Sequence, residues 1–518
     1  MTAYYKYLSV DGAELFTVFS LPAGEGKFPT VICRNPYVDA LQDKTEQELV
    51  TYYLAENKTL LENGFAVVNQ HCRGRGKSTG DCIPYIYERE DGLSLQDRVR
   101  SESFYNGELY LIGGSYTASV HYVTAPFAKD IKGAVLSVQD TERYNCNYRN
   151  GFYKIGLHGD WYVNMYKRKS GIYKAYSKEA YCMLPLSDFS KTVFGEPAED
   201  FDEILRHPDK NDPFWTTTRF GGAEAHDATK HANIPILFTT GFYDIYTGGV
   251  FDMWNSLDDE TRAKCALAVN PYDHGGAPSD SSGEFPNGTL AEAFGNYPLA
   301  WLLSVRDGTK PPFEKGKITY YHLFKNEWCV AERLNGEKTL SLPLGDGERT
   351  YTYNPYAPAF FKEGLSCNFG GAGYGAPPNS RYDIISLYTE PFEEDVSVRG
   401  KMQARLFVKS DCKDTCFYMR VYLAGEKGDY GLRDDITKIS NFVADYREGE
   451  TLEISFTFDE HAFLIKKGER IRVDISSSAF PQYVPHTNQR GLFSEQTAAR
   501  VAHNTVVLTG SELVLTTE

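Results

Sequence analysis

The sequence predicts three parts: an α/β domain built on a parallel sheet, a mostly helical insertion within it, and a C-terminal all-β domain. Short apolar runs alternate with helical or loop segments through the first 140 residues, as in a sheet covered by helices. This pattern stops near residue 141, resumes near residue 232, and gives way beyond residue 310 to runs of alternating apolar and polar residues. A chain of 518 residues is also too long for one ordinary domain.

The α/β domain is predicted from its strands. Their apolar residues are continuous rather than alternating, which is typical of strands buried on both faces of a parallel sheet. The runs are Pro29–Cys33, Phe65–Asn69, Leu109–Ile112 and Gly133–Val138 in the first segment, with the pattern resuming between Ile234 and Asn270 in the second. We assign residues 1–140 and 232–309 to this domain.

The other two parts differ from the α/β domain in composition and in hydrophobic pattern. Residues 141–231 are rich in Tyr, Lys, Asp and Glu and include a helix-like segment at 198–205, so we expect an inserted helical cap. Residues 310–518 contain period-2 runs separated by Gly and Asp turns, which predicts an antiparallel β jelly roll. Examples of these runs are Lys401–Val408, Thr451–Phe458 and Glu469–Ser476.

The acidic composition excludes several classes of partner. The chain has 70 acidic and 54 basic residues, a net charge of −16, whereas nucleic acids and anionic membranes favour basic patches. No stretch approaches the roughly 20 apolar residues that span a bilayer, and the first residues lack the apolar core of a signal peptide. Ten scattered cysteines in so long a chain indicate reduced thiols. We therefore expect a cytoplasmic protein without a nucleic-acid or membrane partner, and a homo-oligomer is compatible with the sequence.

The strongest functional motif follows the run Leu109–Ile112. There Gly113-Gly114-Ser115-Tyr116 ends a short buried strand with small residues and a serine. Proteins with the α/β-hydrolase fold present a nucleophile in this way, on a strained turn where bulky neighbours would collide. Because Gly-x-Ser alone is a common turn sequence, the interpretation depends on residues further along the chain.

Two such residues follow later strands. Asp244 comes after the run Ile236–Phe238, and His274 comes after Ala266–Asn270. Each lies just past a predicted strand end, in the chain order serine, acid, histidine that this fold uses. Together with Ser115 they form a candidate catalytic triad.

Two other aspartates are alternatives for the acid. Asp273 is adjacent to His274, but neighbouring side chains in extended backbone point apart, so it would orient the ring poorly. Asp140 also follows a strand and stays open as an alternative. We prefer Asp244 because it occupies a turn at a strand end directly before the strand that leads to the histidine.

These residues predict acyl transfer to water. Ser115 would attack a carbonyl, His274 would take its proton and pass it to the leaving group, and Asp244 would hold the imidazole in the required tautomer. This chemistry needs no metal or organic cofactor, and none is expected.

The developing oxyanion needs two hydrogen-bond donors. The backbone N–H of Tyr116 is one, because it directly follows the nucleophile. The usual second donor lies in the loop after an early strand, here Arg34-Asn35-Pro36-Tyr37. This loop lacks glycine, so the hydroxyl of Tyr37 is the candidate, although one tyrosine among 37 is a weak signal by composition.

Several motifs in order resemble the CocE/NonD hydrolases, which belong with the S15 peptidases and include α-amino acid ester hydrolases and Xaa-Pro dipeptidyl-peptidases. The matching segments are Arg34–Tyr37, Arg73–Gly80, Gly113–Tyr116, Phe242–Asp244 and Pro271–Gly275, with further similarity at the entry to the C-terminal domain. The resemblance covers nearly the whole chain.

The resemblance implies a serine esterase or amidase with a helical cap and a jelly roll. By position, Tyr37 would match the family's oxyanion tyrosine, with the Tyr116 amide beside it. It also makes Trp161, Tyr162 and Tyr246 candidate walls of a substrate pocket, a role that ordinary core packing rivals. Ala118 replaces a glycine of the family pattern, which indicates a divergent branch.

Three hypotheses follow. The first is a carboxylic ester hydrolase acting on a small acyl ester, with a small-molecule ester or amide as its substrate. The second is an aminopeptidase or α-amino acid ester hydrolase, in which Asp160 or the acidic stretch 198–203 would recognise a free amino group. The third is a non-catalytic protein whose jelly roll binds carbohydrate.

Overall fold

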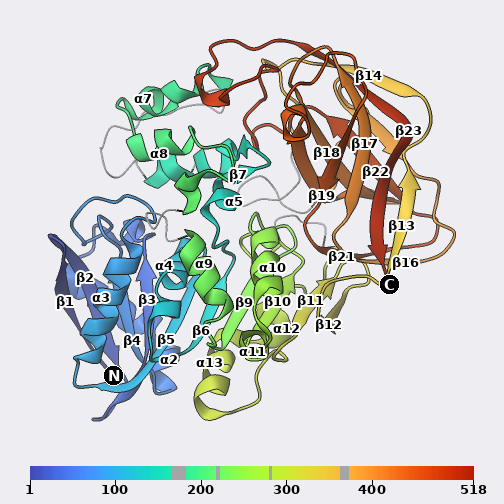
Figure 1. Cartoon of the computed structure of the whole chain (residues 1–518). Coiled ribbons are helices and arrows are strands. Elements are labelled where there is room, and N and C mark those ends of the chain that lie inside the picture. The colour runs from blue at the N-terminus through green and yellow to red at the C-terminus, as the bar shows by residue number, and fades with distance from the viewer. Residues whose placement is uncertain (160, 166–181, 217–221, 279–282, 362–372) are drawn as a thin grey trace.

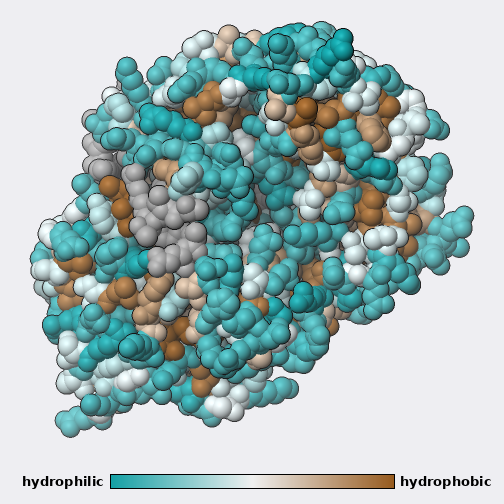
Figure 2. All heavy atoms as spheres, viewed as in Figure 1, coloured by the Kyte–Doolittle hydropathy of each residue, from teal (hydrophilic) through white to brown (hydrophobic). Residues whose placement is uncertain are grey.

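The chain forms three groups of elements, a large sheet with helices, a small group above it, and two antiparallel sheets beside them (Figure 1). This computed structural model describes residues 1–159, 161–165, 182–216, 222–278, 283–361 and 373–518. Figure 2 shows one face that is largely hydrophilic, with hydrophobic residues in small separate groups. Within the described ranges, no helix combines the length and the apolar character needed to cross a bilayer.

Ten strands of the described chain form the large sheet, in the order β1-β2-β4-β3-β5-β6-β9-β10-β11-β12. From β4 to β11 all neighbours are parallel, and the outer strands at both edges are antiparallel. The bounds are β1 Thr2–Val10, β2 Ala13–Leu21, β3 Phe28–Asn35, β4 Ala66–His71, β5 Tyr105–Gly114, β6 Ile131–Ser137, β9 Ile236–Gly241, β10 Ala266–Asn270, β11 Ile318–His322 and β12 Glu327–Ala331. The predicted parallel sheet is confirmed.

Helices cover both faces of the central strands. They are α1 Glu46–Glu56, α2 Lys58–Glu62, α3 Glu88–Arg100, α4 Tyr116–Tyr122, α9 Gly222–Lys230, α10 Thr247–Ser256, α11 Asp259–Arg262, α12 Leu290–Phe294 and α13 Tyr297–Asp307, with short 3-10 turns at Asp39–Leu41 and Ala125–Phe127. In β5, Leu109 and Leu111 pack with residues of α3 and α4, whereas Tyr110 packs on the other face with Trp301 of α13. Successive side chains of a strand point to opposite sides, so the continuous apolar run of β5 is buried on both faces of the sheet.

Some elements of this part were not expected from the sequence. The hairpin β1–β2 pairs over its full length and adds an antiparallel edge. Strands β11 and β12 extend the same sheet although they lie beyond residue 309. Helix α9 lies within 141–231 and yet sits beside α4 and α10 (Figure 1). The proposed division of the chain into domains stays a prediction.

The small group above the sheet is the cap. Its elements are α5 Arg143–Asn147, β7 Tyr148–Arg149, β8 Phe152–Tyr153, a π-helical turn Ile155–Gly159, 3-10 turns Leu186–Asp188 and Pro213–Thr216, α7 Phe189–Phe194 and α8 Glu199–Ile204. Tyr148, Phe201 and Trp215 are buried in one cluster at its centre. The cap is mainly helical as predicted, with the short hairpin β7–β8 as an addition.

Two antiparallel sheets form the C-terminal part, and they confirm the prediction of an all-β domain. Among the described residues, seven strands lie in one sheet and four in the other. The larger sheet contains β13 Lys338–Pro343, β14 Glu348–Tyr353, β16 Val396–Gly400, β17 Gln403–Ser410, β20 Leu452–Thr457, β21 His461–Ile465 and β23 Ala502–Thr517. The smaller contains β15 Ile385–Tyr388, β18 Cys416–Gly425, β19 Gly428–Lys438 and β22 Arg470–Ser476, and 3-10 turns lie at Ile439–Asn441 and Phe493–Glu495.

The C-terminal part holds the segment that leads from β9 to Asp244. The hydroxyl of Tyr243 donates to the carbonyl oxygen of Gly431 at 2.7 Å, and the guanidinium of Arg433 donates to the carbonyl oxygen of Phe242. Two residues immediately before Asp244 are therefore fixed from β19. The position of this acid depends on contacts between parts far apart in the sequence.

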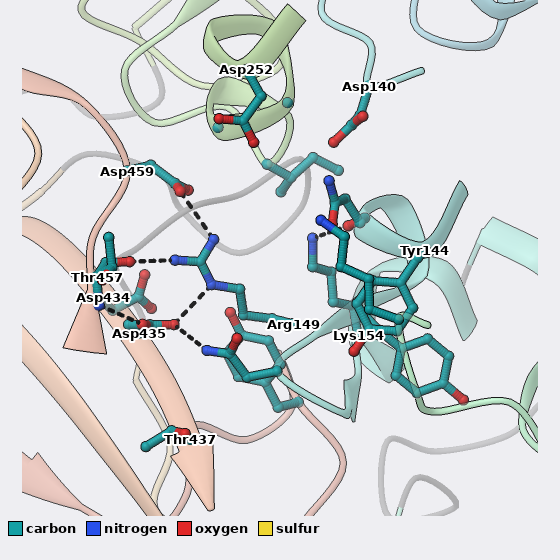
Figure 3. Close-up of a pocket in the computed structure, with 18 of the residues that line it drawn as sticks. Asp140, Tyr144, Arg149, Lys154, Asp252, Asp434, Asp435, Thr437, Thr457 and Asp459 are labelled. Carbon is teal, nitrogen blue, oxygen red and sulfur yellow. Dashed lines mark hydrogen bonds and ion pairs between the residues drawn. The ribbon is translucent and has the colours of Figure 1, made fainter. Parts of the chain in front are cut away.

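A polar pocket of about 400 Å³ lies where the cap, α10 and the C-terminal sheets meet (Figure 3). Arg149 of β7 lies between two carboxylates of the C-terminal part, at 2.8 Å from Asp435 and 3.0 Å from Asp459. The side chain of Asp435 is only 2% exposed, so its charge depends on this guanidinium.

Replacing Arg149 with methionine is expected to destabilise the protein by about 2–3 kcal/mol, because two largely buried carboxylates lose their shared cation. The apparent melting temperature should fall by about 2–3 °C. Arg447→Met is the control, because its ion pair with Glu450 is exposed and should contribute under about 0.5 kcal/mol. Equal melting temperatures for the two variants would contradict this account of the interface.

Candidate active site

Ser115 stands in strained backbone between β5 and α4. Its φ is 57° and its ψ is −131°, a region that residues with side chains rarely adopt. Its N–H donates to the carbonyl oxygen of Ser137 in β6 at 2.9 Å, which fixes the turn to the sheet. A Cβ on Gly113 would lie 2.1 Å from the carbonyl oxygen of Thr117, so only glycine fits there. The strained turn after a buried strand is the local structure that the motif predicted.

Asp244 and His274 lie together at the carboxyl end of the sheet. His274 Nδ1 is 3.1 Å from Asp244 Oδ1, and the side chain of Asp244 is completely buried. The backbone N–H of Tyr246 donates to the same carboxylate oxygen at 2.9 Å. Because Nδ1 faces the carboxylate, Nε2 is the imidazole nitrogen left for proton transfer.

Two opposing effects set the pKa of His274. Burial lowers it, but the charge of Asp244 and the hydrogen bond to that carboxylate raise it more. The pKa of His274 therefore lies above its ordinary value of 6.5. This electrostatic balance stabilises the imidazolium that a general base becomes.

The two alternative acids have other partners. Asp273 Oδ1 accepts a hydrogen bond from the N–H of Gly275 at 3.1 Å, within its own turn. Asp140 Oδ1 accepts one from the N–H of Glu142 at 2.8 Å, and its carboxyl lies against Gly249 of α10. The structure brings the carboxylate of Asp244 to the ring nitrogen of His274.

The candidate oxyanion residues lie beside the serine turn. The hydroxyl of Tyr37 accepts a hydrogen bond from Trp161 Nε1 at 3.1 Å, and the rings of Tyr37 and Tyr116 are 6.2 Å apart. A hydroxyl that accepts one hydrogen bond can still donate its own hydrogen. The amide of Tyr116 is the first of α4, and first-turn amides have no acceptor within their own helix.

The three candidate pocket residues differ in position. The ring of Tyr246 is 5.5 Å from that of His274, and Trp161 contacts Tyr37, so both border the candidate site. Tyr162 instead packs against Phe201 at 5.3 Å in the buried cluster of the cap. Asp160, suggested for binding an amino group, lies outside the described residues.

Sequence reasoning missed three residues beside this site: Tyr85, Arg143 and His158. Tyr85 stacks on Trp161 at 5.5 Å, and His158 Nε2 lies 3.4 Å from the hydroxyl of Tyr246. The guanidinium of Arg143 lies over the ring of Tyr85, 4.1 Å from its centre. All three come from loops or the cap, where no strand-end pattern marks a residue as functional.

Two protein-family models match this chain. The family model of the X-Pro dipeptidyl-peptidases (S15 family) matches residues 11–276, more than half of the chain. This chain belongs to the S15 family. The C-terminal non-catalytic domain model of the X-Pro dipeptidyl-peptidases matches residues 334–513 of the same S15 protein. The predicted resemblance is therefore confirmed.

Individual relatives of this S15 protein cover nearly its whole length. Cocaine esterase from Rhodococcus sp. (strain MB1 Bresler) is 24% identical over 94% of this chain and 92% of its own. An α-amino acid ester hydrolase structure has a TM-score of 0.82 at 16% identity, covering 100% of this chain and 97% of its own. An aminopeptidase structure from a marine sediment Thaumarchaeota archaeon has a TM-score of 0.79 at 18% identity, covering 99% and 96%.

These findings establish the fold and the broad activity. The S15 protein has the α/β-hydrolase fold with a C-terminal all-β domain, as predicted. It is a serine hydrolase of the esterase or peptidase type. The third hypothesis, a non-catalytic carbohydrate-binding protein, is therefore not retained.

Proposed function

We propose that this S15 hydrolase cleaves small acyl esters through Ser115, His274 and Asp244. The observation that carries the proposal is the partly buried hydrogen bond from His274 to Asp244, at the same edge of the sheet as the strained turn of Ser115. Parallel strands end at one edge, which brings residues after β5, β9 and β10 into one region. A nucleophile, a base and an acid that orients the base are the requirements of acyl transfer.

The reaction begins when His274 Nε2 takes the proton of Ser115 and the serine oxygen attacks the substrate carbonyl. Asp244 holds the ring through Nδ1 and stabilises the imidazolium. The imidazolium then protonates the leaving alcohol, and the acyl group stays on Ser115. Water, activated by the neutral imidazole, releases the acid and restores the serine.

Negative charge on the substrate carbonyl would be stabilised by the Tyr116 amide and the Tyr37 hydroxyl. The Tyr116 side chain is fixed below this point, because its hydroxyl donates to Glu88 Oε1 at 2.8 Å and accepts from the N–H of Tyr85 at 2.7 Å. The orientation of the amide is thus supported by buried hydrogen bonds rather than by the helix alone.

Replacing Tyr37 with phenylalanine is expected to lower kcat for ester hydrolysis about 10²-fold with little change in KM. The substitution removes one donor that acts mainly in the transition state. Steady-state kinetics on a neutral 4-nitrophenyl ester would measure the loss. Tyr52→Phe, an exposed tyrosine on α1, is the matched control and should leave kcat unchanged. A Tyr37→Phe variant with full kcat would exclude the hydroxyl as a donor.

The second hypothesis, hydrolysis of α-amino acid esters or N-terminal dipeptides, is tested by the same kinetics. We expect higher kcat/KM for neutral 4-nitrophenyl esters than for aminoacyl or Xaa-Pro 4-nitroanilides. The acidic stretch 198–203 gives the alternative little support, because Asp202 accepts a hydrogen bond from Ser190 at 2.9 Å inside the cap. Faster cleavage of the anilides would favour the second hypothesis, a peptidase or amidase, over an esterase.

A further inference from the structure

Arg143 is a buried cation without a carboxylate partner in the described chain. The residue begins α5 and is only 4% exposed. Its Nη2 donates to the backbone oxygen of Asp140 at 2.7 Å, while its buried Nη1 has no hydrogen-bond partner among the described residues. Three other buried arginines, Arg34, Arg73 and Arg75, each pair with a carboxylate at 2.5–2.7 Å, whereas buried Arg433 donates to backbone oxygens. A buried guanidinium with an unused donor points to an acceptor from outside the described residues.

Contacts through two aromatic rings connect Arg143 to the candidate oxyanion site. Its guanidinium lies 4.1 Å above the ring of Tyr85, which stacks on Trp161 with an interplanar angle of 22°. Trp161 in turn donates to the hydroxyl of Tyr37 at 3.1 Å. Tyr85 has a φ of 70°, which is costly for a residue with a side chain. Strained backbone thus places this ring between the cation and the site.

Arg143 is also connected to His274, through His158 and Tyr246. The charge of Arg143 contributes to the low pKa of His158, after burial and the charge of Lys154. His158 Nε2 is 3.4 Å from the hydroxyl of Tyr246, whose ring is 5.5 Å from that of His274. His158 is 3% exposed, and its Nδ1 is a second buried polar atom without a partner in the described chain. The two unused atoms belong to side chains that flank the proposed triad.

The carboxyl group of Asp140 offsets only part of the charge of Arg143, because the two side chains interact through their charges without forming an ion pair. Asp140 meets Arg143 through its backbone oxygen, whereas its side chain lines the polar pocket next to α10 (Figure 3). Burial raises the pKa of Asp140 to about 7, so it is only partly ionised at neutral pH. The surroundings of Arg143 therefore favour an anion and oppose an ammonium group.

We propose that Arg143 binds a carboxylate of the substrate, so that the preferred substrates are esters or amides with a free carboxylate. This inference rests on the proposed function. A guanidinium presents N–H donors in a fork that matches a carboxylate, and the unused Nη1 supplies one of them. The same feature disfavours substrates with a free α-amino group, because their ammonium would approach a buried cation.

The test uses esters that differ only in charge. One panel consists of 4-nitrophenyl esters whose acyl chain of four to eight carbons ends in a carboxylate, a methyl ester or an ammonium group. A second panel places the charge on the leaving group, with 4-acyloxybenzoates and their methyl esters. In at least one panel, kcat/KM should be about 10- to 100-fold higher for the carboxylate than for the neutral ester of equal length.

Variants and inhibitors connect this preference to Arg143. Arg143→Met should reduce the ratio of carboxylate to neutral kcat/KM to about 1, and Arg143→Lys should retain part of it. Adipate should inhibit neutral ester hydrolysis by the wild-type enzyme more strongly than dimethyl adipate does, a measurement that depends on no variant. The folding of Arg143→Met is checked by its melting temperature.

Two outcomes would overturn the inference. One is a preference for neutral or ammonium substrates at every length in both panels, with no inhibition by adipate. The other is an unchanged charge preference in a folded Arg143→Met variant. Labelling by a neutral fluorophosphonate separates these outcomes from failure of the proposed function. If Ser115 is labelled but carboxylates are not preferred, only the present inference fails; if Ser115 is not labelled and no ester is cleaved, the proposed function fails.

Discussion

Replacing Ser115 with alanine is expected to lower kcat for ester hydrolysis by at least about 10⁴-fold, because no other group can form the acyl-enzyme. KM should change little, since the hydroxyl is a small part of the substrate contacts. The residual rate would come from binding and from the oxyanion donors, which remain in place. Steady-state kinetics on a 4-nitrophenyl ester, with active enzyme corrected for purity, would measure this loss.

Ser119→Ala provides a matched control on the helix that follows Ser115. Ser119 is buried in α4, one turn after Ser115, and its hydroxyl has no hydrogen-bond partner in the described chain. Its removal should change kcat by less than about threefold. If Ser115→Ala kept more than a tenth of the wild-type kcat, the assignment of the nucleophile would be wrong.

Replacing Asp244 with asparagine is expected to lower kcat about 10³- to 10⁴-fold and to shift the pH profile. A general base must be neutral, so kcat/KM rises with pH through the pKa of His274. In the wild-type enzyme burial lowers the pKa of His274, but the charge of Asp244 raises it more, so that this pKa lies above 6.5. The acidic limb of the pH profile should therefore lie above pH 6.5. Without that charge burial dominates, and the limb should move to lower pH.

Asp273→Asn is the control for this second prediction. Asp273 is adjacent to His274, and its carboxylate accepts a hydrogen bond from its own turn. Its charge contributes less than that of Asp244 to the pKa of His274. We expect a loss of less than about tenfold in kcat and a smaller shift of the acidic limb. A larger effect at Asp273 than at Asp244 would reverse the assignment of the acid.

Strands were the most predictable part of the fold. The run Leu109–Ile112 lies within β5 because continuous apolar residues satisfy two buried faces at once. The antiparallel run Lys401–Val408 overlaps β17 for the related reason that one face is buried and the other is not. The edge hairpin β1–β2 escaped prediction because its outer strand is mostly exposed or half-buried, which gives no continuous apolar run.

The site was predictable where chemistry and strand ends coincide. Ser115, Asp244 and His274 each follow a buried strand, so a single sequence places them at one edge of the sheet. The partners of Arg143 and His158 depend instead on how the cap folds over that edge. Short helices and loops carry no periodic signal, and contacts between them are set by tertiary packing rather than by local sequence.

The most direct test of the account is covalent labelling by a fluorophosphonate followed by peptide mapping with mass spectrometry. A reactive serine in a functional triad is modified once per chain, and denatured enzyme is not modified. We predict a single adduct on Ser115, in the peptide that contains Gly113-Gly114-Ser115-Tyr116, with labelling lost in the Asp244→Asn variant. A stoichiometric adduct on another serine, or no adduct on an enzyme that hydrolyses esters, would contradict the proposed mechanism.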